Sequence, residues 1–288
     1  MTVNDHIKKI KQELSVLYDV NEINSFTYII FEHLLNYSKI DLILNKDQKT
    51  SSETDLYIAE IIYRLRNEEP IQYIIGKTNF CDLDFVTQPG VLIPRPETEE
   101  LVVMIIKAVQ KKEISAENIL DIGTGSGCIA VSLKKYLPES RVQALDISEK
   151  ALKIARNNAS LNMTDVEFLK ADILNHDKVA VSEKFDLIVS NPPYVTIEDK
   201  EKMSRNVLDY EPASALFFQG NNPLVFYEAI ADFSAKHLKD NGNLFLEINE
   251  KFGRETAGML KQKLSGKVEI LKDLSGKDRF VVVKYNQH

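Results

Sequence analysis

Hydrophobic residues at helical spacing dominate the first seventy residues of the chain. Isoleucine and leucine recur in residues 7–17 at intervals of three, four and three, which places them on one face of an amphipathic helix. Residues 24–37 and 53–67 form two further apolar segments of helical length. No proline precedes Pro70 and no glycine precedes Gly76, so little interrupts these segments. The pattern predicts a small helical bundle.

Short apolar stretches separated by proline and glycine replace this pattern between Pro70 and Pro96. The stretches IQYII, FCDLDFV and QPGVLIPRP are typical of an extended, hairpin-like segment. We therefore predict three parts: a helical domain at 1–75, an extended linker at 76–96 and a larger domain at 97–288.

Apolar runs and helical segments alternate along the larger domain. After a helical segment at its start, five short apolar runs are separated by stretches of helical period; the runs are NILDIG, RVQALD, VEFLKAD, FDLIVS and NLFLEIN. Runs of this kind are buried in parallel sheets, and their alternation with helices is the βαβ pattern of a doubly wound fold. We predict an α/β fold of the Rossmann-like type, preceded by the helical bundle.

Composition and charge narrow the choice of partners. The chain has 44% hydrophobic and 27% charged residues and a net charge of −7, and neither the first 75 residues nor the remainder is basic overall. Nucleic acid is therefore not the expected partner. Two cysteines 47 residues apart and five scattered histidines show no metal spacing. We therefore expect no bound metal. Since no secretory signal or membrane-spanning apolar run is visible, we also expect a cytoplasmic protein.

A glycine-rich loop follows the first apolar run of the larger domain. The loop reads DIGTGSG and contains Gly123, Thr124, Gly125, Ser126 and Gly127, with a helical segment directly after it. Glycine lets a backbone turn sharply and approach a ligand closely. A strand before such a loop and a helix after it predict a nucleoside-binding site.

Acidic residues follow the next two apolar runs. Asp146, 21 residues beyond Gly125, is placed to accept both ribose hydroxyls of a nucleoside, although a role as a helix cap is the alternative. The loop pattern G-x-G-x-G lacks the last glycine of a dinucleotide fingerprint, which suits a sulfonium donor that has no pyrophosphate. Asp172 is a second candidate, for the adenine amino group, and Ile173 could pack on the adenine face.

The sequence Asn191-Pro192-Pro193-Tyr194 directly follows the run FDLIVS, where ligands bind in open α/β sheets. Two prolines remove two N–H donors, so the local backbone presents carbonyls. Together with the side-chain oxygen of Asn191, these carbonyls can hold both hydrogens of a planar –NH2 group, and Tyr194 could pack over its other face. Acceptors that strengthen as the nitrogen becomes cationic favour the transition state of methyl transfer. The motif predicts a catalytic and substrate-binding role for these residues.

These features together resemble the HemK/PrmC family, the release factor glutamine methyltransferases. The resemblance runs from about Pro70 to the C-terminus, on the motifs PIQYIIG, PGVLIPRPETEELV, DIGTGSG, NPPY, YEPASAL and GKDRFVVV. It implies a class I methyltransferase domain with S-adenosyl-L-methionine as methyl donor. It also implies a glutamine substrate in the Gly-Gly-Gln loop of class 1 release factors, whose body the helical domain would dock.

The resemblance also assigns roles to residues. It implies that the loop Gly123–Gly127, Asp146, Ile173 and Asn191 contact the donor, that 191–194 hold the glutamine, and that PRPETE lines the pocket. Two positions depart from the family pattern: Asn249 stands where glycine is usual, and residues 217–227 lack a Gly-Asp-Gly-Leu pattern. Two other functions stay open, an adenine- or cytosine-amino DNA methyltransferase and a non-catalytic binding protein with this fold.

Overall fold

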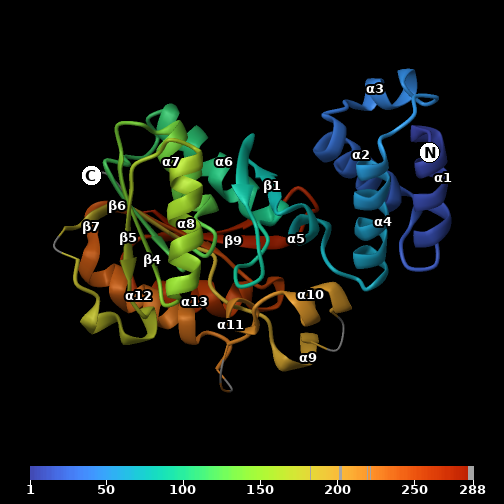
Figure 1. Ribbon diagram of the computed structural model, residues 1–288. Helices are drawn as coiled ribbons and strands as arrows, with labels where there is room; N and C mark the ends of the chain where they lie inside the picture. Colours follow the sequence, from blue (N-terminus) through green and yellow to red (C-terminus); the bar gives the residue numbers. More distant parts are fainter. Residues whose placement is uncertain (182, 201–202, 219, 221, 285–288) are drawn as a thin grey trace. The chain divides into compact units, whose positions relative to one another are not determined.

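The computed structural model describes residues 1–181, 183–200, 203–218, 220 and 222–284. The chain divides into two compact units, which Figure 1 shows coloured along the sequence. The first unit comprises Met1–Gly76 and Ser204–Tyr210, and the second comprises Lys77–Met203 and Glu211–His288. The segment predicted as a linker thus belongs almost entirely to the second unit, and the chain returns to the first unit at 204–210.

The first unit is helical. Its helices are α1 (Val3–Leu14), α2 (Val20–Leu35), α3 (Lys39–Leu44), α4 (Ser52–Arg66), α5 (Ile71–Ile75) and α10 (Arg205–Tyr210). The first, second and fourth cover the segments predicted as helices, and their apolar faces form one core. The prediction for IQYII was wrong: it forms α5, because Ile71 packs into this core and Gly76 ends the turn with φ +80°.

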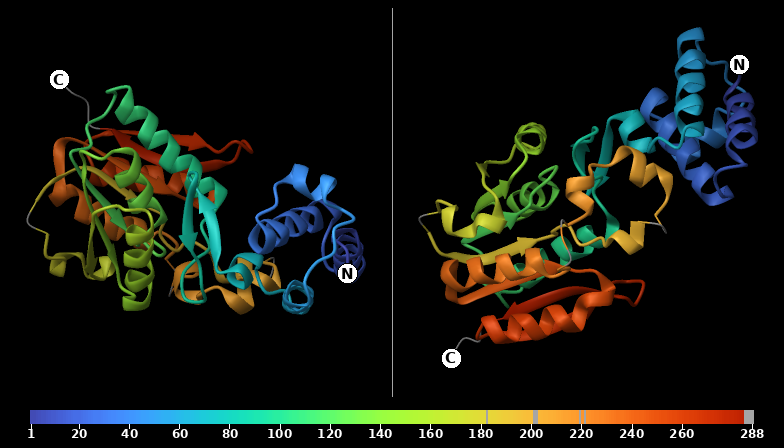
Figure 2. Two further views of the ribbon diagram at one scale, coloured as in Figure 1. Left: turned by 45° about the horizontal axis from the view of Figure 1, so that its top comes forward. Right: turned by 90° about the horizontal axis from the view of Figure 1, so that it is seen from below.

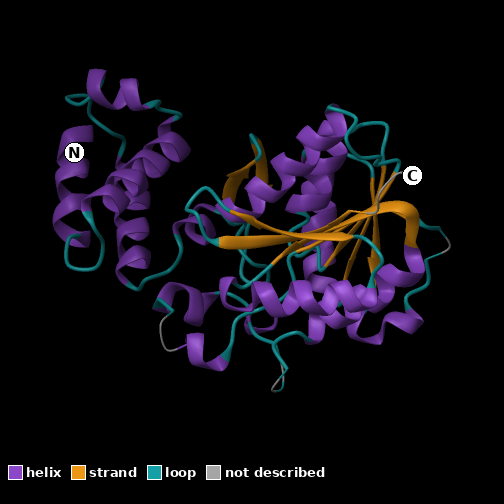
Figure 3. Ribbon diagram, turned by 180° about the vertical axis from the view of Figure 1, so that it is seen from behind, coloured by secondary structure: helices purple, strands orange, loops and turns teal. Residues whose placement is uncertain are grey.

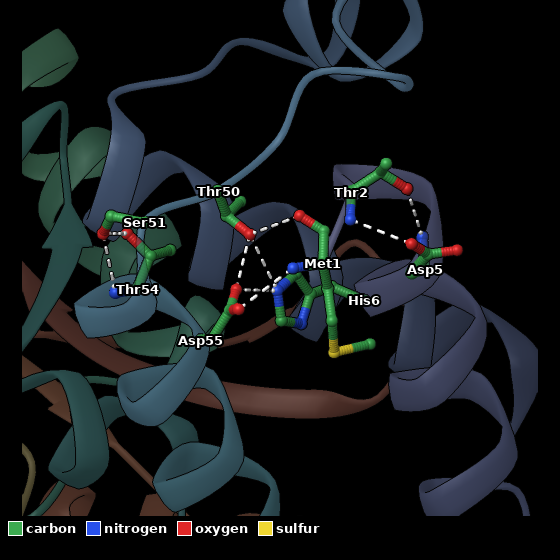
Figure 4. Close-up of polar contacts among 8 residues, drawn as sticks. All are labelled: Met1, Thr2, Asp5, His6, Thr50, Ser51, Thr54 and Asp55. Carbon is green, nitrogen blue, oxygen red and sulfur yellow. Dashed lines mark hydrogen bonds and ion pairs between the residues drawn. The ribbon is translucent and has the colours of Figure 1, made fainter.

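A polar cluster joins the start of α1 to the start of α4, as Figure 4 shows. Nε2 of the buried His6 lies 2.7 Å from Oδ1 of Asp55 and 3.1 Å from Oγ1 of Thr50. The Thr50 hydroxyl also donates to Asp55, and this bond is the largest of several contacts that hold the pKa of Asp55 far below its usual value. The cluster therefore fixes the ends of two helices that are far apart in sequence.

The second unit is built on a seven-stranded sheet, drawn in orange in Figure 3. The strand order is β5-β4-β3-β6-β7-β9-β8. Within this sheet β9 pairs antiparallel with β7 and β8, and the other described pairs are parallel. The bounds are β3 Asn118–Ile122, β4 Arg141–Asp146, β5 Val166–Lys170, β6 Phe185–Ser190, β7 Leu238–Glu247, β8 Lys267–Lys272 and β9 Asp278–Lys284. The first five are the strands that the apolar runs predicted.

Helices cover both faces of this sheet, as Figures 2 and 3 show. One face packs on α6 (Pro96–Gln110), α7 (Cys128–Tyr136) and α8 (Glu149–Leu161), and the other packs on α12 (Val225–His237) and α13 (Gly253–Lys263). Neighbouring residues of a strand serve opposite cores: Ile119 belongs to the first and Leu120 to the second. The sheet is therefore buried on both sides, as its near-continuous apolar strands require.

Short elements complete the second unit. They are the hairpin of β1 (Lys77–Phe80) and β2 (Leu83–Val86), the helices α9 (Ile197–Lys200) and α11 (Ala213–Leu216), and the 3-10 helices η1 (Ile173–Lys178) and η2 (Glu250–Phe252). In the hairpin, Cys81 and Asp82 both have positive φ, which matches a tight two-residue turn. Across the described residues, no helix is long and apolar enough to cross a membrane.

The strand order creates a switch point between β3 and β6. From β3 the chain proceeds through β4 and β5 to one side of the sheet, and from β6 it proceeds through β7 to the other side. The loops after β3 and β6 therefore diverge at the carboxyl edge of the sheet. Ligands of doubly wound folds bind in the crevice that this divergence opens.

Candidate active site

A pocket with about 860 Å³ of empty space, part of it open to solvent, lies at this edge of the sheet. Residues that follow β3, β4, β5 and β6 line it together with segments 90–92 and 212–215. The lining is mostly apolar, with two carboxylates, Asp146 and Asp172, and one amide, Asn191. A concave site of this kind, with few polar groups, is typical of small-molecule binding.

The glycine-rich loop contributes backbone to the pocket. Gly123 and Gly125 line it with φ of +76° and +55°, and apart from each glycine and its two chain neighbours no protein atom lies within 4 Å of the position that a Cβ would take. The space beside both glycines is thus open to a ligand. This placement agrees with the reason for which glycine was expected there.

Three other residues of the loop are not among those that line the pocket. Thr124 is buried and donates to Oδ2 of Asp121, and Ser126 is also buried. A Cβ on Gly127 would lie 3.0 Å from the Cβ of Ala155, so glycine here permits the loop to approach α8 closely. These three residues were predicted to bind the donor, but in the structure they shape the loop and do not line the pocket.

Asp146 is the last residue of β4 and faces the pocket. Its Oδ2 accepts the N–H of Gly125 at 2.9 Å, and its Oδ1 accepts the N–H of Ser148 at 2.8 Å. Burial raises the pKa of Asp146, and these backbone hydrogen bonds oppose the rise. The cap of α8 is Ser148, whose side chain accepts from the N–H of Ala151. Each Asp146 oxygen keeps a lone pair for a ligand hydroxyl.

Asp172 and Ile173 both line the pocket, but Asp172 does not end β5, which stops at Lys170. The Asp172 carboxylate caps η1: it accepts the N–H of Leu174 at 3.0 Å and the side-chain amide of Asn175 at 2.6 Å. Ile173 is buried and contributes apolar surface. The expectation that Asp172 binds an adenine amino group remains a prediction, with its carboxylate already engaged in the cap.

The residues after β6 divide into two groups. Asn191, Pro192 and Pro193 line the pocket, whereas Tyr194 is not among the lining residues. The Tyr194 hydroxyl instead donates to Oε1 of Glu247 at 3.0 Å, and its ring packs on the core beneath α12. Three of the four residues predicted to hold the substrate therefore lie together at the pocket. Tyr194 is instead anchored to Glu247 and the core.

A buried hydrogen-bond network lies behind Asn191. Its Nδ2 donates to Oγ1 of Thr98 at 2.9 Å, and Thr98 donates to Oε2 of Glu247 at 2.6 Å. Thr98 stands in the first turn of α6, and Glu247 ends β7. Thr98 belongs to the segment PRPETE, yet residues 90–92 line the pocket and PRPETE does not, which differs from the expectation. Glu247 carried no sequence signal beyond its place at a strand end.

The segment that precedes α6 is tied to residues 211–215. Arg95 donates through Nη2 to Oε1 of Glu211 at 2.5 Å, and Oε2 of Glu211 accepts the N–H of Ile93 at 3.3 Å. Burial raises the pKa of Glu211, and the Arg95 charge opposes that rise. Arg95 therefore holds the segment before α6 to residue 211. Pro212, Ser214 and Ala215, which follow Glu211, line the pocket.

Asn249, one of the two departures from the family pattern, supports the loop after β6. Its Nδ2 donates to the carbonyl of Tyr194 at 3.2 Å, and its Oδ1 accepts the N–H of Lys251 at 3.0 Å. The side chain thus fixes the far end of the sequence NPPY. In the other departing segment, 217–227, residues 219 and 221 lie outside the described residues.

Comparisons with known proteins find matches for both units of the chain. Residues 82–284 match the family "Methyltransferase small domain", and residues 7–76 match the family "PrmC N-terminal domain". The 16S rRNA N2 G1207 methyltransferase of T. thermophilus, solved with AdoMet and guanosine, has a similar fold, with a TM-score of 0.53 and 17% identity over 73% of this chain and 50% of that chain. A methyltransferase from Pyrococcus furiosus has a TM-score of 0.53 and 19% identity, over 82% of this chain and all of that chain.

The family match, the strand order and the pocket at the switch point define a class I methyltransferase with a Rossmann-like fold. The release factor glutamine methyltransferase of Flavobacterium psychrophilum is 42% identical to the chain over 99% of this chain and all of that protein. That of Bacteroides thetaiotaomicron is 42% identical over 94% of this chain and 96% of that protein. The chain belongs to the family of release factor glutamine methyltransferases.

Proposed function

We propose that this chain transfers a methyl group from S-adenosyl-L-methionine to the side-chain amide nitrogen of a glutamine, in the Gly-Gly-Gln loop of class 1 release factors. The observation that carries the proposal is the placement of Asn191, Pro192 and Pro193 at the same pocket as the glycine-rich loop and Asp146. Acceptors for a planar amide and a nucleoside-binding loop thus meet in one crevice.

The pocket fits the proposed donor. Open space beside Gly123 and Gly125 leaves room for its methionine portion, and the two Asp146 oxygens each retain a lone pair for a ribose hydroxyl. Ile173 and the apolar lining suit an adenine ring. When bound, the donor supplies a methyl group on a positively charged sulfur, which a weak nucleophile can attack.

The hydrogen-bond acceptors after β6 hold the amide nitrogen of the substrate in position for methyl transfer. Asn191 Oδ1 and the backbone carbonyls of the two prolines accept hydrogen bonds from the substrate –NH2 group. These bonds strengthen as positive charge grows on the nitrogen, so they favour the transition state over the ground state. No metal-like cluster of acidic, histidine and cysteine side chains occurs in the described part of the chain, and the proposed reaction needs none.

The first unit supplies a surface for the body of the release factor. Helix α3 buries none of its residues and exposes Ile40, Ile43 and Leu44, at 68%, 72% and 74%. These positions share one helix face, and apolar surface gathered in this way marks interaction sites. We propose that this face contacts the release factor, so the docking role assigned to the helical domain rests on α3.

A triple variant of α3 tests this docking role. Replacing Ile40, Ile43 and Leu44 by serine should raise KM for the intact release factor at least about tenfold, the loss expected for several apolar contacts, and leave donor affinity unchanged. The matched control is Leu161→Ser and Met163→Ser, two exposed apolar residues of the second unit. An unchanged KM in the triple variant would show that α3 does not contact the release factor.

DNA methylation is the alternative, because an exocyclic amine meets the same acceptors. It needs a basic surface for phosphate, and the overall charge of −7 does not favour it. The relatives with 42% identity carry the name release factor glutamine methyltransferase. Offering the enzyme a labelled donor with either release factor or DNA distinguishes the two substrates.

A further inference from the structure

The Asn191 side chain can face the pocket with either end of its amide, and the two ends have opposite chemistry. The oxygen accepts hydrogen bonds, and the nitrogen donates them. Only the oxygen can hold a substrate –NH2 group. Something in the protein must therefore select the orientation of this amide, and the selecting groups lie on α6 and β7.

Hydrogen-bond polarity in the buried network supplies the selection. An ionised Glu247 can only accept a hydrogen bond, so the Thr98 hydroxyl, whose oxygen lies 2.6 Å from Oε2, must donate its hydrogen bond to the carboxylate. The Thr98 oxygen is then left to accept. Its partner at 2.9 Å on Asn191 must therefore be the donor Nδ2, and Oδ1 becomes the opposite end of the amide.

We infer that Thr98 and Glu247 are positioning residues, which turn the oxygen of Asn191 toward the substrate amide through a one-way chain of hydrogen bonds. This inference rests on the proposed function, since it explains how an acceptor of the substrate –NH2 group is oriented. The network also bonds the Tyr194 hydroxyl to Oε1, so both oxygens of Glu247 receive a proton donor from a residue beside the site.

The hydrogen bonds from Asn191 through Thr98 to Glu247 run in a single direction only while Glu247 is ionised. Burial raises the pKa of Glu247 to about 6, and hydrogen bonds from Thr98 and Tyr194 and the charge of Arg279 on β9 oppose the rise. Glu97 on α6 raises it slightly, and Tyr227 on α12 faces the same group. A protonated Glu247 can donate to Thr98, which frees the threonine hydroxyl to donate toward Asn191. The amide then loses its preferred orientation as pH falls below about 6.

Two substitutions at Thr98 separate orientation from packing. Thr98→Val has nearly the same shape and lacks the hydroxyl, so it removes the hydrogen bonds to both Asn191 and Glu247. Thr98→Ser keeps the hydroxyl and with it both hydrogen bonds. Thermal unfolding and calorimetric titration with S-adenosyl-L-methionine verify that both variants fold and bind the donor.

Single-turnover methylation of release factor at saturating donor gives the first readout. Thr98→Val should slow methyl transfer about 10- to 100-fold, the scale of a misplaced catalytic group, with little change in KM, and Thr98→Ser should stay near the parent. The parent rate should also fall on the acid side with an apparent pKa near 6, and this limb should be absent in Thr98→Val. If the valine variant matches the parent in rate and pH profile, the inference is overturned, whereas a parent enzyme inactive on release factor overturns the proposed function.

The side-chain ¹⁵N–¹H signals of Asn191 give a second readout that needs no activity. They are assigned by their loss in Asn191→Ala and followed from pH 5 to pH 8. We expect them to shift with the ionisation of Glu247 in the parent and in Thr98→Ser, and to be independent of pH in Thr98→Val. Signals that do not respond to pH in the parent would overturn the inference whatever the substrate proves to be.

Discussion

The backbone N–H of Gly125 donates to Oδ2 of Asp146 over 2.9 Å, and this bond joins the loop after β3 to the end of β4. The carboxylate thus shapes the glycine-rich loop and faces the pocket with its remaining lone pairs. The Asp146 side chain therefore both holds the loop that would accommodate the methionine portion of the donor and faces the proposed ribose site.

Asp146→Ala should weaken donor binding. The variant loses two charge-assisted hydrogen bonds to the ribose, at about 1.5–3 kcal/mol each, and releases the N–H of Gly125 as well. Calorimetric titration with S-adenosyl-L-methionine measures the loss. Asp165→Ala, at an exposed acid outside the pocket, is the control and should bind as the parent does. Equal affinity in the two variants would contradict the ribose role of Asp146.

Asn191→Ala should slow the chemical step much more than it weakens binding. It removes an acceptor whose hydrogen bond strengthens in the transition state, and the loss of one such contact costs about 10²–10³-fold. Single-turnover rates at saturating donor measure this step, and donor titration is the control. A variant that transfers methyl at nearly the parental rate would leave the two proline carbonyls as the whole acceptor site.

Glu211→Ala should reduce both stability and donor affinity. It leaves Arg95 unpaired and the N–H of Ile93 without its acceptor, which should cost about 1–3 kcal/mol in the free energy of unfolding. Because Pro212, Ser214 and Ala215 line the pocket, the donor should also bind more weakly. Glu149→Ala breaks an exposed pair with Arg156 and should cost at most about 0.5 kcal/mol. Equal losses of stability in the two variants would show that the buried pair has no special weight.

Asp121→Asn should change how stability depends on pH. Burial raises the pKa of Asp121 to about 7, far above the 3.8 of an exposed carboxyl, so between about pH 4 and pH 7 the folded state holds a proton that the unfolded state releases. Stability of the parent therefore falls as pH rises through this window, by at most about 1.4 kcal/mol per pH unit for one group. The asparagine variant lacks this loss.

The stability of Asp121→Asn relative to the parent should consequently rise from pH 4 to pH 7 and stay constant above that. Urea unfolding at several pH values measures the difference. A difference that is constant across this range would mean that Asp121 is ionised in the folded protein throughout.

The sequence predicted most of the sheet and its helices, because periodicity and strand-helix alternation are local signals. Helix α5 was missed, since its five residues are held by burial of Ile71 rather than by a pattern. Strands β8 and β9 were not predicted as strands, although β9 contains most of a recognised motif. Most predicted site residues line the pocket, namely Gly123, Gly125, Asp146, Asp172, Ile173, Asn191, Pro192 and Pro193, whereas Thr124, Ser126, Gly127 and Tyr194 do not. Thr98 and Glu247 were not assigned, because their roles depend on contacts across 149 positions of sequence.

A methylation assay tests whether the pocket methylates a glutamine amide of a release factor. Purified release factor with an intact Gly-Gly-Gln loop is incubated with the enzyme and methyl-labelled S-adenosyl-L-methionine, with double-stranded DNA as a parallel substrate, and the label is located by mass spectrometry. We predict one methyl group on the side-chain nitrogen of the loop glutamine, none on DNA, and none on release factor in which that glutamine is alanine. Label on DNA bases, or on any other residue of the release factor, would contradict the account.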